Sequence, residues 1–223
     1  ALCSKNLPTP TIALPGDNFN TVLYTGDGSA EAVTGVGFSP DFIWLKTRNS
    51  ATSHKLYDVI RGVSSSLRTN TTGAAAVDSD ENLTSFDSDG FTIKDPDYIV
   101  SSRTVVSWNW LAGTAPTADN SAGVGATPTA GSVKIDGSNL GSALAGTIAA
   151  TRLSANTTAG FSIVSYTGTG EASNKTVGHG LGVAPALVIV KSRGATGGWY
   201  VFHQDLNSNY NILLNDSATQ WNP

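Results

Sequence analysis

The sequence contains no methionine and only one cysteine, Cys3. A single cysteine cannot close an intramolecular disulfide, so the fold cannot depend on that kind of cross-link. We expect Cys3 to be a small buried or terminal residue rather than a reactive thiol. Because a translated chain begins with methionine and residue 1 is alanine, we also expect the sequence to be a processed product or an interior part of a longer modular protein.

Charged residues are scarce, at 13% of the 223 residues, and they sum to a net charge of −4. A nucleic-acid surface needs a basic stripe, so we expect no nucleic-acid partner. No run of about 18 apolar residues occurs, so we expect no membrane insertion. Apolar residues make up only 39%, and Gly, Ser, Thr and Asn are abundant. This composition is typical of an extracellular β-protein with many turns, and it lacks the Glu, Lys and Leu bias of helical proteins.

One block of the sequence occurs twice, at residues 19–48 and residues 161–193. In each copy an apolar run ends in Tyr-Thr-Gly-x-Gly, and a β-rich run after a proline closes in Lys-x-Arg. The matched positions are Tyr24 with Tyr166, Gly26 with Gly168, Gly28 with Gly170, Pro40 with Pro185, Lys46 with Lys191, and Arg48 with Arg193. Because a repeat fixes the number of units, we predict two units of the same sheet topology, each closing its own apolar interior.

Short strand-like runs between turn residues predict an all-β fold of tandem β-sandwich units. The clearest strand is residues 104–111, where polar and large apolar side chains alternate. Val106, Trp108 and Trp110 fall on one face of this strand because successive side chains of a strand point to opposite faces. We expect this aromatic face to point into the core, with about 1.5–3 kcal/mol gained from burying each side chain.

Composition divides the chain into four parts. Residues 1–17 are rich in proline, which predicts an extended connector from an upstream domain. Residues 18–113 form the first β-sandwich unit. Residues 114–159 have the Gly, Ala, Ser and Thr content of a linker with short elements, among them a strand that ends at Asp136-Gly137 and a segment that is either a short helix or coil. Residues 160–223 form the second unit.

The second unit is predicted to be incomplete. Nothing in residues 160–223 corresponds to the SDGFTI segment or to the tryptophan strand of the first unit. A sandwich without its last strands leaves apolar faces open and strand edges unpaired. We expect either polypeptide beyond residue 223 or a strand of a neighbouring chain to complete it.

No pattern of catalytic residues is present. The three histidines, His54, His179 and His203, lack ligand spacing to one another or to cysteine, which argues against zinc. The glycine-rich stretch around His179 precedes a strand rather than a helix, so it is no phosphate cradle. There is no G-x-S-x-G nucleophile motif, and only three glutamates occur. We therefore predict no enzyme activity and no required cofactor, with a glycosidase carboxylate pair as the weaker alternative.

Two weaker ligand sites are candidates. Asp87 and Asp89, in an acidic stretch with Asp78, Asp80 and Glu81, offer oxygen ligands for calcium, although a solvated turn with Asp and Gly for backbone reasons is the preferred interpretation. The speculative sugar-binding residues are Trp199, Tyr200 and His203, which follow a Gly-Gly pair. One of the two aromatic rings is expected to fill the core instead.

The repeated basic residues after the β-rich runs are predicted to have a structural task. Lys46 and Arg48 recur as Lys191 and Arg193. We expect a carboxylate partner such as Asp58 in the first unit.

The wording of these motifs resembles a known family. The stretch LYTGDGSAEAVTGVGFSPDFIWLKTRNSATSHKLYDVIRG, with LTSFDSDGFTI and VVSWNWLAG after it, resembles a domain of unknown function in structural proteins of tailed bacteriophages, especially marine ones. ANTTAGFSIVSYTGTG and TVGHGLGVAPALVIVKSRG resemble the second half of the same proteins, and ALCSKNLPTPTI resembles the connector after an upstream SPRY or lectin-like domain. The resemblance implies a lectin-like sandwich of jelly-roll or concanavalin type, and it assigns no catalytic residue.

The resemblance also implies a location and a role. It predicts a non-enzymatic structural or adhesive module on the virion surface, in a tail fibre or similar appendage, that assembles as a homo-oligomer. Its partners would be other virion subunits and possible host-surface glycan. The alternatives are a capsid-surface decoration protein without a ligand and a carbohydrate-binding module of a secreted glycosidase.

Overall fold

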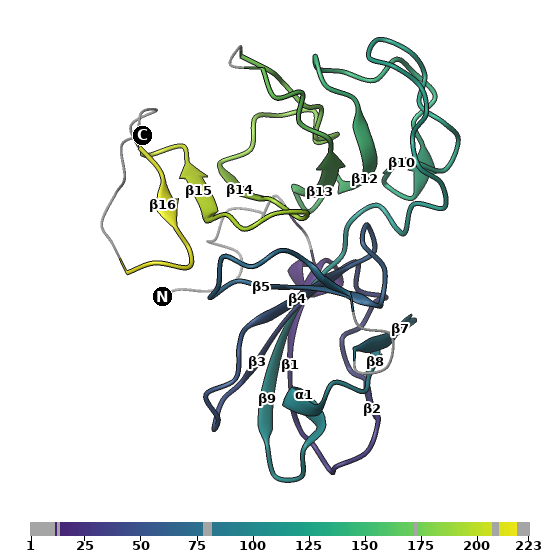
Figure 1. Cartoon of the computed structure of the whole chain (residues 1–223). Helices are drawn as coiled ribbons and strands as arrows, with labels where there is room; N and C mark the ends of the chain where they lie inside the picture. The colour runs from purple at the N-terminus through teal and green to yellow at the C-terminus, as the bar shows by residue number, and fades with distance from the viewer. Residues whose placement is uncertain (1–11, 13, 78–81, 172–173, 207–209, 218–223) are drawn as a thin grey trace, which may run out of the picture.

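The computed structural model describes residues 12, 14–77, 82–171, 174–206 and 210–217, so most of the predicted connector 1–17 lies outside the described residues. The chain is almost entirely β, which confirms the predicted fold class. Figure 1 shows the first unit in the lower half of the molecule and the later strands above it.

Two antiparallel sheets build the first unit. The larger sheet has the order β1-β9-β3-β4-β5-β6, and the smaller has the order β2-β8-β7. The larger sheet consists of β1 (Phe19–Thr25), β3 (Phe42–Thr47), β4 (Lys55–Asp58), β5 (Ser65–Arg68), β6 (Ala76–Val77) and β9 (Thr104–Trp110). The smaller sheet consists of β2 (Glu31–Val33), β7 (Leu83–Asp87) and β8 (Gly90–Ile93). A short 3-10 turn, Pro15–Asp17, precedes β1, and the helix α1 (Pro96–Ile99) precedes β9.

The core of the first unit lies between these two sheets and α1. One face of the larger sheet contributes alternate side chains, because residues two apart on a strand share a face. The buried cluster consists of Val33, Ile43, Leu45, Tyr57, Leu83, Phe91, Ile93, Tyr98 and Val105, with Val22 and Tyr24 packed against it. The smaller sheet therefore acts as the cover of the larger one.

The strand β9 is turned the opposite way from the prediction. Val105, Ser107 and Asn109 are fully buried and face the smaller sheet, whereas Trp108 and Trp110 lie half-buried on the outer face. Alternation identifies the two faces of a strand, but it does not say which one points inward. The expectation of a core-facing tryptophan stripe is wrong because the outer face is also covered, by the second unit.

Residues 114–159 contain more ordered structure than a linker. A four-stranded sheet of order β11-β10-β12-β13 is built from β10 (Val133–Ile135), β11 (Ser138–Asn139), β12 (Ala150–Asn156) and β13 (Phe161–Tyr166). The predicted turn at Asp136-Gly137 joins β10 to β11, and both residues have positive φ. No helix forms between residues 140 and 153, because β12 pairs with β10 on one side and β13 on the other.

A fourth sheet follows in the second unit. It has the order β14-β15-β16, from β14 (Leu187–Lys191), β15 (Trp199–His203) and β16 (Ile212–Leu213). These strands repeat β3, β4 and β5 of the first unit in chain order and in antiparallel pairing. In Figure 1 the later strands run from right to left in the order β10, β12, β13, β14, β15 and β16.

The two units nevertheless differ in how they are closed. The strand β9 joins β1 to β3 in the first unit, but among the described residues no strand joins β13 to β14. Tyr24 packs against the core of the first unit, whereas its counterpart Tyr166 is 45% exposed. The expectation that each unit closes its own interior is therefore wrong for the described residues of the second unit.

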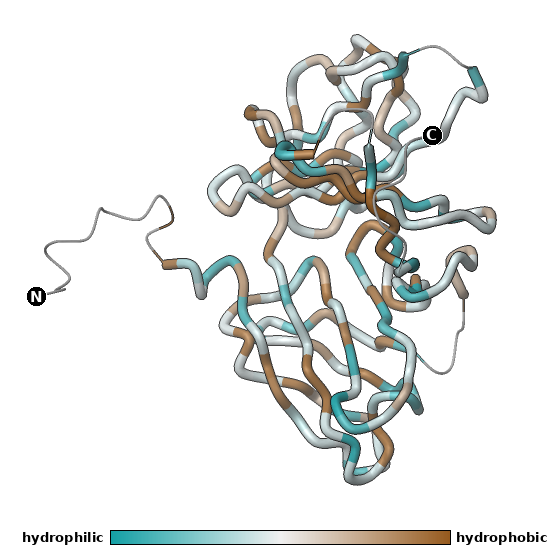
Figure 2. The backbone as a smooth tube through the Cα atoms, turned by 90° about the vertical axis from the view of Figure 1, so that its left-hand side faces the viewer, coloured by the Kyte–Doolittle hydropathy of each residue, from teal (hydrophilic) through white to brown (hydrophobic). Residues whose placement is uncertain are grey.

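The second unit is anchored on the outer face of the first. The ring of Phe161 stacks on Trp110 at 5.8 Å between centroids and meets Phe42 edge-on at 5.5 Å. Trp199 is buried against Leu56 and Leu67. Figure 2 shows apolar segments gathered where the upper and lower parts of the molecule meet. Aromatic and aliphatic packing thus joins the units.

A buried ion pair connects β4 to α1 and yields the first prediction. Lys55 Nζ lies 2.5 Å from Asp95 Oδ2, and both side chains are almost fully buried. Lys55→Met leaves the Asp95 carboxylate without its cation, so we expect a loss of about 3–5 kcal/mol in the free energy of unfolding. Urea titration followed by circular dichroism measures this loss.

Lys175 supplies the matched control for that prediction. It pairs with Glu171 at the surface, where both side chains are partly exposed. Because a surface ion pair contributes little, Lys175→Met should change the free energy of unfolding by no more than about 1 kcal/mol. Equal losses in the two variants would contradict the structural role of the buried pair.

Candidate functional site

The candidate site is a glycine loop that occurs in both units. In the first unit, Gly35 and Gly37 flank the buried residue Val36, and both glycines have positive φ, near +86° and +89°. Their amide groups donate hydrogen bonds to the Asp89 carboxylate, at 3.1 Å and 2.6 Å. The bonds from Gly37 and Gly35 hold the pKa of the Asp89 carboxyl below its usual range, because they favour its charged form.

The second unit has the same loop without a carboxylate. Counting back from the shared proline, Pro40 or Pro185, matches Gly35 and Gly37 to Gly180 and Gly182, which have φ near +76° and +73°. The residue between them, Leu181, is buried as Val36 is. Among the hydrogen bonds between described residues, none uses the amide of Gly180 or Gly182 as donor. The loop is therefore formed, and its two amides have no acceptor within the described part of the chain.

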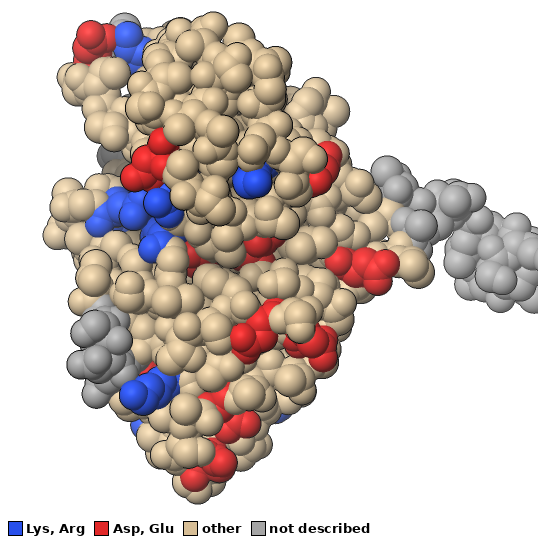
Figure 3. Space-filling model, turned by 90° about the vertical axis from the view of Figure 1, so that its right-hand side faces the viewer, with Lys and Arg blue, Asp and Glu red and all other residues tan. Residues whose placement is uncertain are grey.

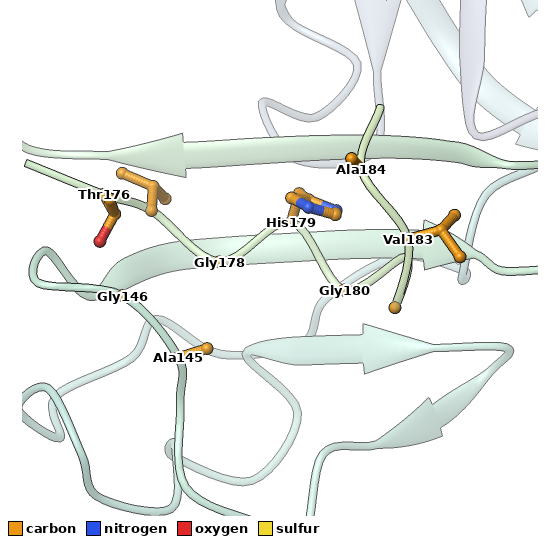
Figure 4. A pocket seen from close by; sticks show the side chains of 10 residues that line it. Ala145, Gly146, Thr176, Gly178, His179, Gly180, Val183 and Ala184 are labelled. Carbon is orange, nitrogen blue, oxygen red and sulfur yellow. The ribbon is translucent and has the colours of Figure 1, made fainter. Parts of the chain in front are cut away.

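This loop lines an open pocket of about 530 Å³. Its walls are Ala145, Gly146, Thr176, Val177, Gly178, His179, Gly180, Gly182, Val183 and Ala184. Figure 4 shows the His179 ring between Gly178 and Gly180, with Ala145 and Gly146 on the opposite side. Small side chains leave the backbone accessible, so the pocket offers amide donors of the kind that bind carboxylates.

His179 has a structural role in this pocket. Its Nδ1 accepts a hydrogen bond from the Leu181 amide at 3.2 Å, and its carbonyl accepts one from the Ser162 hydroxyl at 2.6 Å. No acidic side chain is among the lining residues, and the polar side chains are those of Thr176 and His179.

The sheet next to the pocket exposes the face that corresponds to the core of the first unit. Ile43 pairs with Tyr57 across β3 and β4, and both are fully buried. The matching pair across β14 and β15 is Val188 with Phe202, and these side chains are 38% and 40% exposed. The difference arises because the first pair lies under the smaller sheet and the second has no such cover among the described residues.

The predicted sugar-binding residues do not form one surface. Trp199 is 4% exposed, and its indole N–H donates to the carbonyls of Arg68 and Thr71, at 3.0 Å and 3.1 Å. It is thus the aromatic ring of the pair that fills an apolar interior. Tyr200 is half-buried and points to the other face of β15, while His203 is exposed beside Asp205.

The carboxylates of the two calcium candidates, Asp87 and Asp89, accept hydrogen bonds from other groups of the first unit. Asp89 accepts from the two glycine amides, and Asp87 accepts from the Thr92 hydroxyl at 2.7 Å. Asp78, Asp80 and Glu81 lie outside the described residues. Within the described ranges, no three His, Cys, Asp or Glu side chains lie close enough to hold a metal ion.

The prediction that Asp58 pairs with the repeated basic residues of the first unit is wrong. Asp58 pairs with Arg61 at 2.7 Å rather than with Lys46. The Lys46 ammonium instead donates to the carbonyls of Ser50 and Thr52, at 3.0 Å and 2.9 Å. In the second unit, Lys191 likewise donates to backbone carbonyls, one of them Thr72 of the first unit. In both units the repeated lysine therefore donates hydrogen bonds to backbone carbonyls of neighbouring loops.

The surface charge is mixed on the face that Figure 3 shows. Acidic residues are scattered over this face, and Lys and Arg side chains occur in small groups rather than as a stripe. Among the helices in the described ranges, the one α-helix has four residues, so none of them could cross a bilayer.

Asp89 provides a prediction that depends on pH. Asp89→Asn removes the negative charge of the group that accepts hydrogen bonds from the two glycine amides, so it should lower the melting temperature at neutral pH. Because the folded pKa is below the unfolded one, the stabilisation by wild-type Asp89 is present above about pH 4 and is lost as pH falls through the folded value. Melting curves from pH 7 to acid should therefore show the two proteins converging. Asp17→Asn, at an exposed position, is the control and should show no such pH-dependent gap.

Trp199 provides a prediction about the anchor between the units. Trp199→Ala leaves a cavity against Leu56 and Leu67, so we expect a loss of about 3–5 kcal/mol in the free energy of unfolding. Phe202→Ala changes an exposed ring of the same strand and should cost about 1 kcal/mol or less. Urea unfolding of both variants tests this, and a larger loss for Phe202→Ala would contradict the packing.

Comparisons with known proteins give a family and no function. Searches of curated proteins and of solved structures each found no match. The family described as Domain of unknown function (DUF7483) matches two segments, residues 14–138 and residues 135–222. The two matches agree with the internal repeat, since each contains one copy of the glycine loop. The chain belongs to the DUF7483 family of domains of unknown function.

Proposed function

We propose that the chain is a non-enzymatic structural module of a tailed-bacteriophage virion, in a tail fibre or similar appendage, that works by contact with neighbouring subunits. The observation that carries this proposal is the uncovered face of the second unit. An apolar sheet face beside a pocket with two glycine amides that have no acceptor among the described residues has the features of a protein-binding surface rather than a reaction centre.

The distribution of exposed apolar side chains supports contact with other proteins. Eight of the fourteen large apolar side chains exposed in the described residues lie after residue 160. They are Tyr166, Val183, Leu187, Val188, Ile189, Phe202, Ile212 and Leu214. Exposed apolar surface marks interaction sites in soluble proteins. These eight side chains all lie in the second unit, whose β14–β16 sheet has no covering sheet among the described residues.

The use of polar side chains also favours a structural role. The buried polar group of Lys55, Tyr57, Asn82 and Asp95 is held by internal hydrogen bonds that connect β4 to α1. Burial, followed by the nearby Asp95 charge, raises the pKa of the Tyr57 hydroxyl, which keeps it a neutral donor. These groups therefore stabilise the first unit, and the resemblance to virion structural proteins supplies the location that we propose.

Host-surface glycan is a weaker part of the proposal. Trp199 is buried, so its ring cannot stack on a sugar, and Tyr200 and His203 lie on opposite faces of β15. Contact with subunits requires only surfaces that are already exposed. We therefore give neighbouring subunits precedence over glycan as partners.

A map of a whole particle that contains this protein tests the proposal. We expect the structure to fit density in a tail appendage. The face of β14 and β15 that carries Val188 and Phe202, called the β14 face, should lie against another subunit. Density on the capsid surface, or a β14 face open to solvent in the assembled particle, would contradict it. Glycan-array binding would restore the adhesive role, and turnover of a polysaccharide would refute the non-enzymatic one.

A further inference from the structure

We propose that the open side of the second unit receives a segment donated by a neighbouring subunit, with the chemistry of residues 83–110. Such a segment consists of a hairpin with Asp-Gly at its turn, followed by an antiparallel strand. This inference deepens the proposed role in assembly and rests on it. The first unit shows how each part of such a segment is bound.

Strand edges give the first part of the argument. In the first unit β9 pairs with β1 from Phe19 to Thr25 and with β3 from Phe42 to Thr47. In the second unit β13 pairs only with β12, and β14 pairs only with β15, within the described part of the chain. Each therefore has an edge of backbone donors and acceptors that a further antiparallel strand could use.

The uncovered sheet face gives the second part. In the first unit β7, β8 and α1 supply Leu83, Phe91, Ile93 and Tyr98, which cover the larger sheet and are themselves buried. The corresponding face of β14 and β15 presents Val188 and Phe202, which have no such cover in the part of the chain that the structure describes. A hairpin of the β7–β8 type would bury these side chains, and apolar burial is the dominant favourable term in protein association.

The glycine loop gives the third part and defines the chemistry most closely. Two amides in a positive-φ loop bind the Asp89 carboxylate in the first unit. Gly180 and Gly182 keep that backbone conformation, and no described group accepts from them. A carboxylate at the turn of a donated hairpin fits this place, because amide–carboxylate hydrogen bonds are charge-assisted.

These three vacant places have one cause. In the first unit the strand, the cover and the carboxylate all come from one continuous stretch, residues 83–110. The sequence contains one such stretch and two units that could receive it. A second copy of this chain could donate its own stretch only by opening its first unit. The donor is therefore a segment other than residues 1–223, and because the proposed function is contact with neighbouring subunits, we assign this segment to one of them.

A synthetic segment can test this assignment. The probe is residues 83–112 of this chain, fused to a small soluble carrier and labelled for fluorescence anisotropy. We expect saturable binding to the full chain. The same probe with Asp89→Asn should bind about ten-fold or more weakly, because it loses the charge that pairs with the glycine amides. A probe with a scrambled strand should not bind.

Variants of the receiving chain locate the binding place. Val188→Arg puts a charge on the uncovered face and should abolish probe binding without unfolding the chain, because Val188 is 38% exposed. Leu23→Arg is the matched control at the edge strand β1, with a side chain 59% exposed, and should bind as wild type does. Circular dichroism spectra and melting curves of both variants show that the fold is kept.

Three outcomes would overturn the inference. No binding of the wild-type probe, equal binding of the Asp89→Asn probe, or unchanged binding to Val188→Arg would each refute a donated segment at this place. Self-association of the chain that Val188→Arg abolishes, measured by analytical ultracentrifugation, would assign the face to a second copy instead. If the probe fails but the particle map holds the chain in an appendage, the inference is lost and the proposed function remains.

Discussion

The structure depends on how one face of a β-sheet is covered. In the first unit the smaller sheet and α1 lie over the larger sheet, and the side chains between them form the largest buried cluster among the described residues. Hydrophobic burial scales with the apolar area removed from water, so a sheet without this cover gains far less from folding. The contrast between Ile43 and Val188, at matched positions, is the clearest expression of this constraint.

In the repeat, the glycine loop is determined by local interactions, and the cover of the sheet is determined by long-range ones. The glycine loops have the same backbone conformation in both units, although only one of them binds a carboxylate. The conformation is therefore fixed by the glycines and by the buried residue between them, since glycine adopts positive φ at little cost. The covering sheet, by contrast, depends on residues far along the chain, and its absence leaves the loop unchanged.

Much of the fold could be predicted from sequence, because the repeat and the strand periodicity are local signals. The tryptophan face of β9 was predicted to point inward, but Trp108 and Trp110 lie half-buried on the outer face, where Trp110 packs against Phe161 of the second unit. Alternation of side chains cannot identify which face meets which partner. Residues 114–159 resembled a linker in composition, yet Val133 and Leu153 join a small core there. The candidate site could not be predicted from His179 or from acidic residues. The signal for this site in the sequence is the pair Gly180 and Gly182, which match Gly35 and Gly37 when the two blocks are aligned on their shared proline.

The docking of Trp199 also sets an order in which the chain can mature. The β14–β16 sheet has its buried aromatic anchor on Leu56 and Leu67, and the Trp199 indole is bound by carbonyls of the first unit. Domains of a nascent chain fold from the amino terminus as they leave the ribosome. The residues that hold Trp199 lie between positions 56 and 71 and are synthesised before residues 187–213, so biosynthesis proceeds in the same direction as structural dependence.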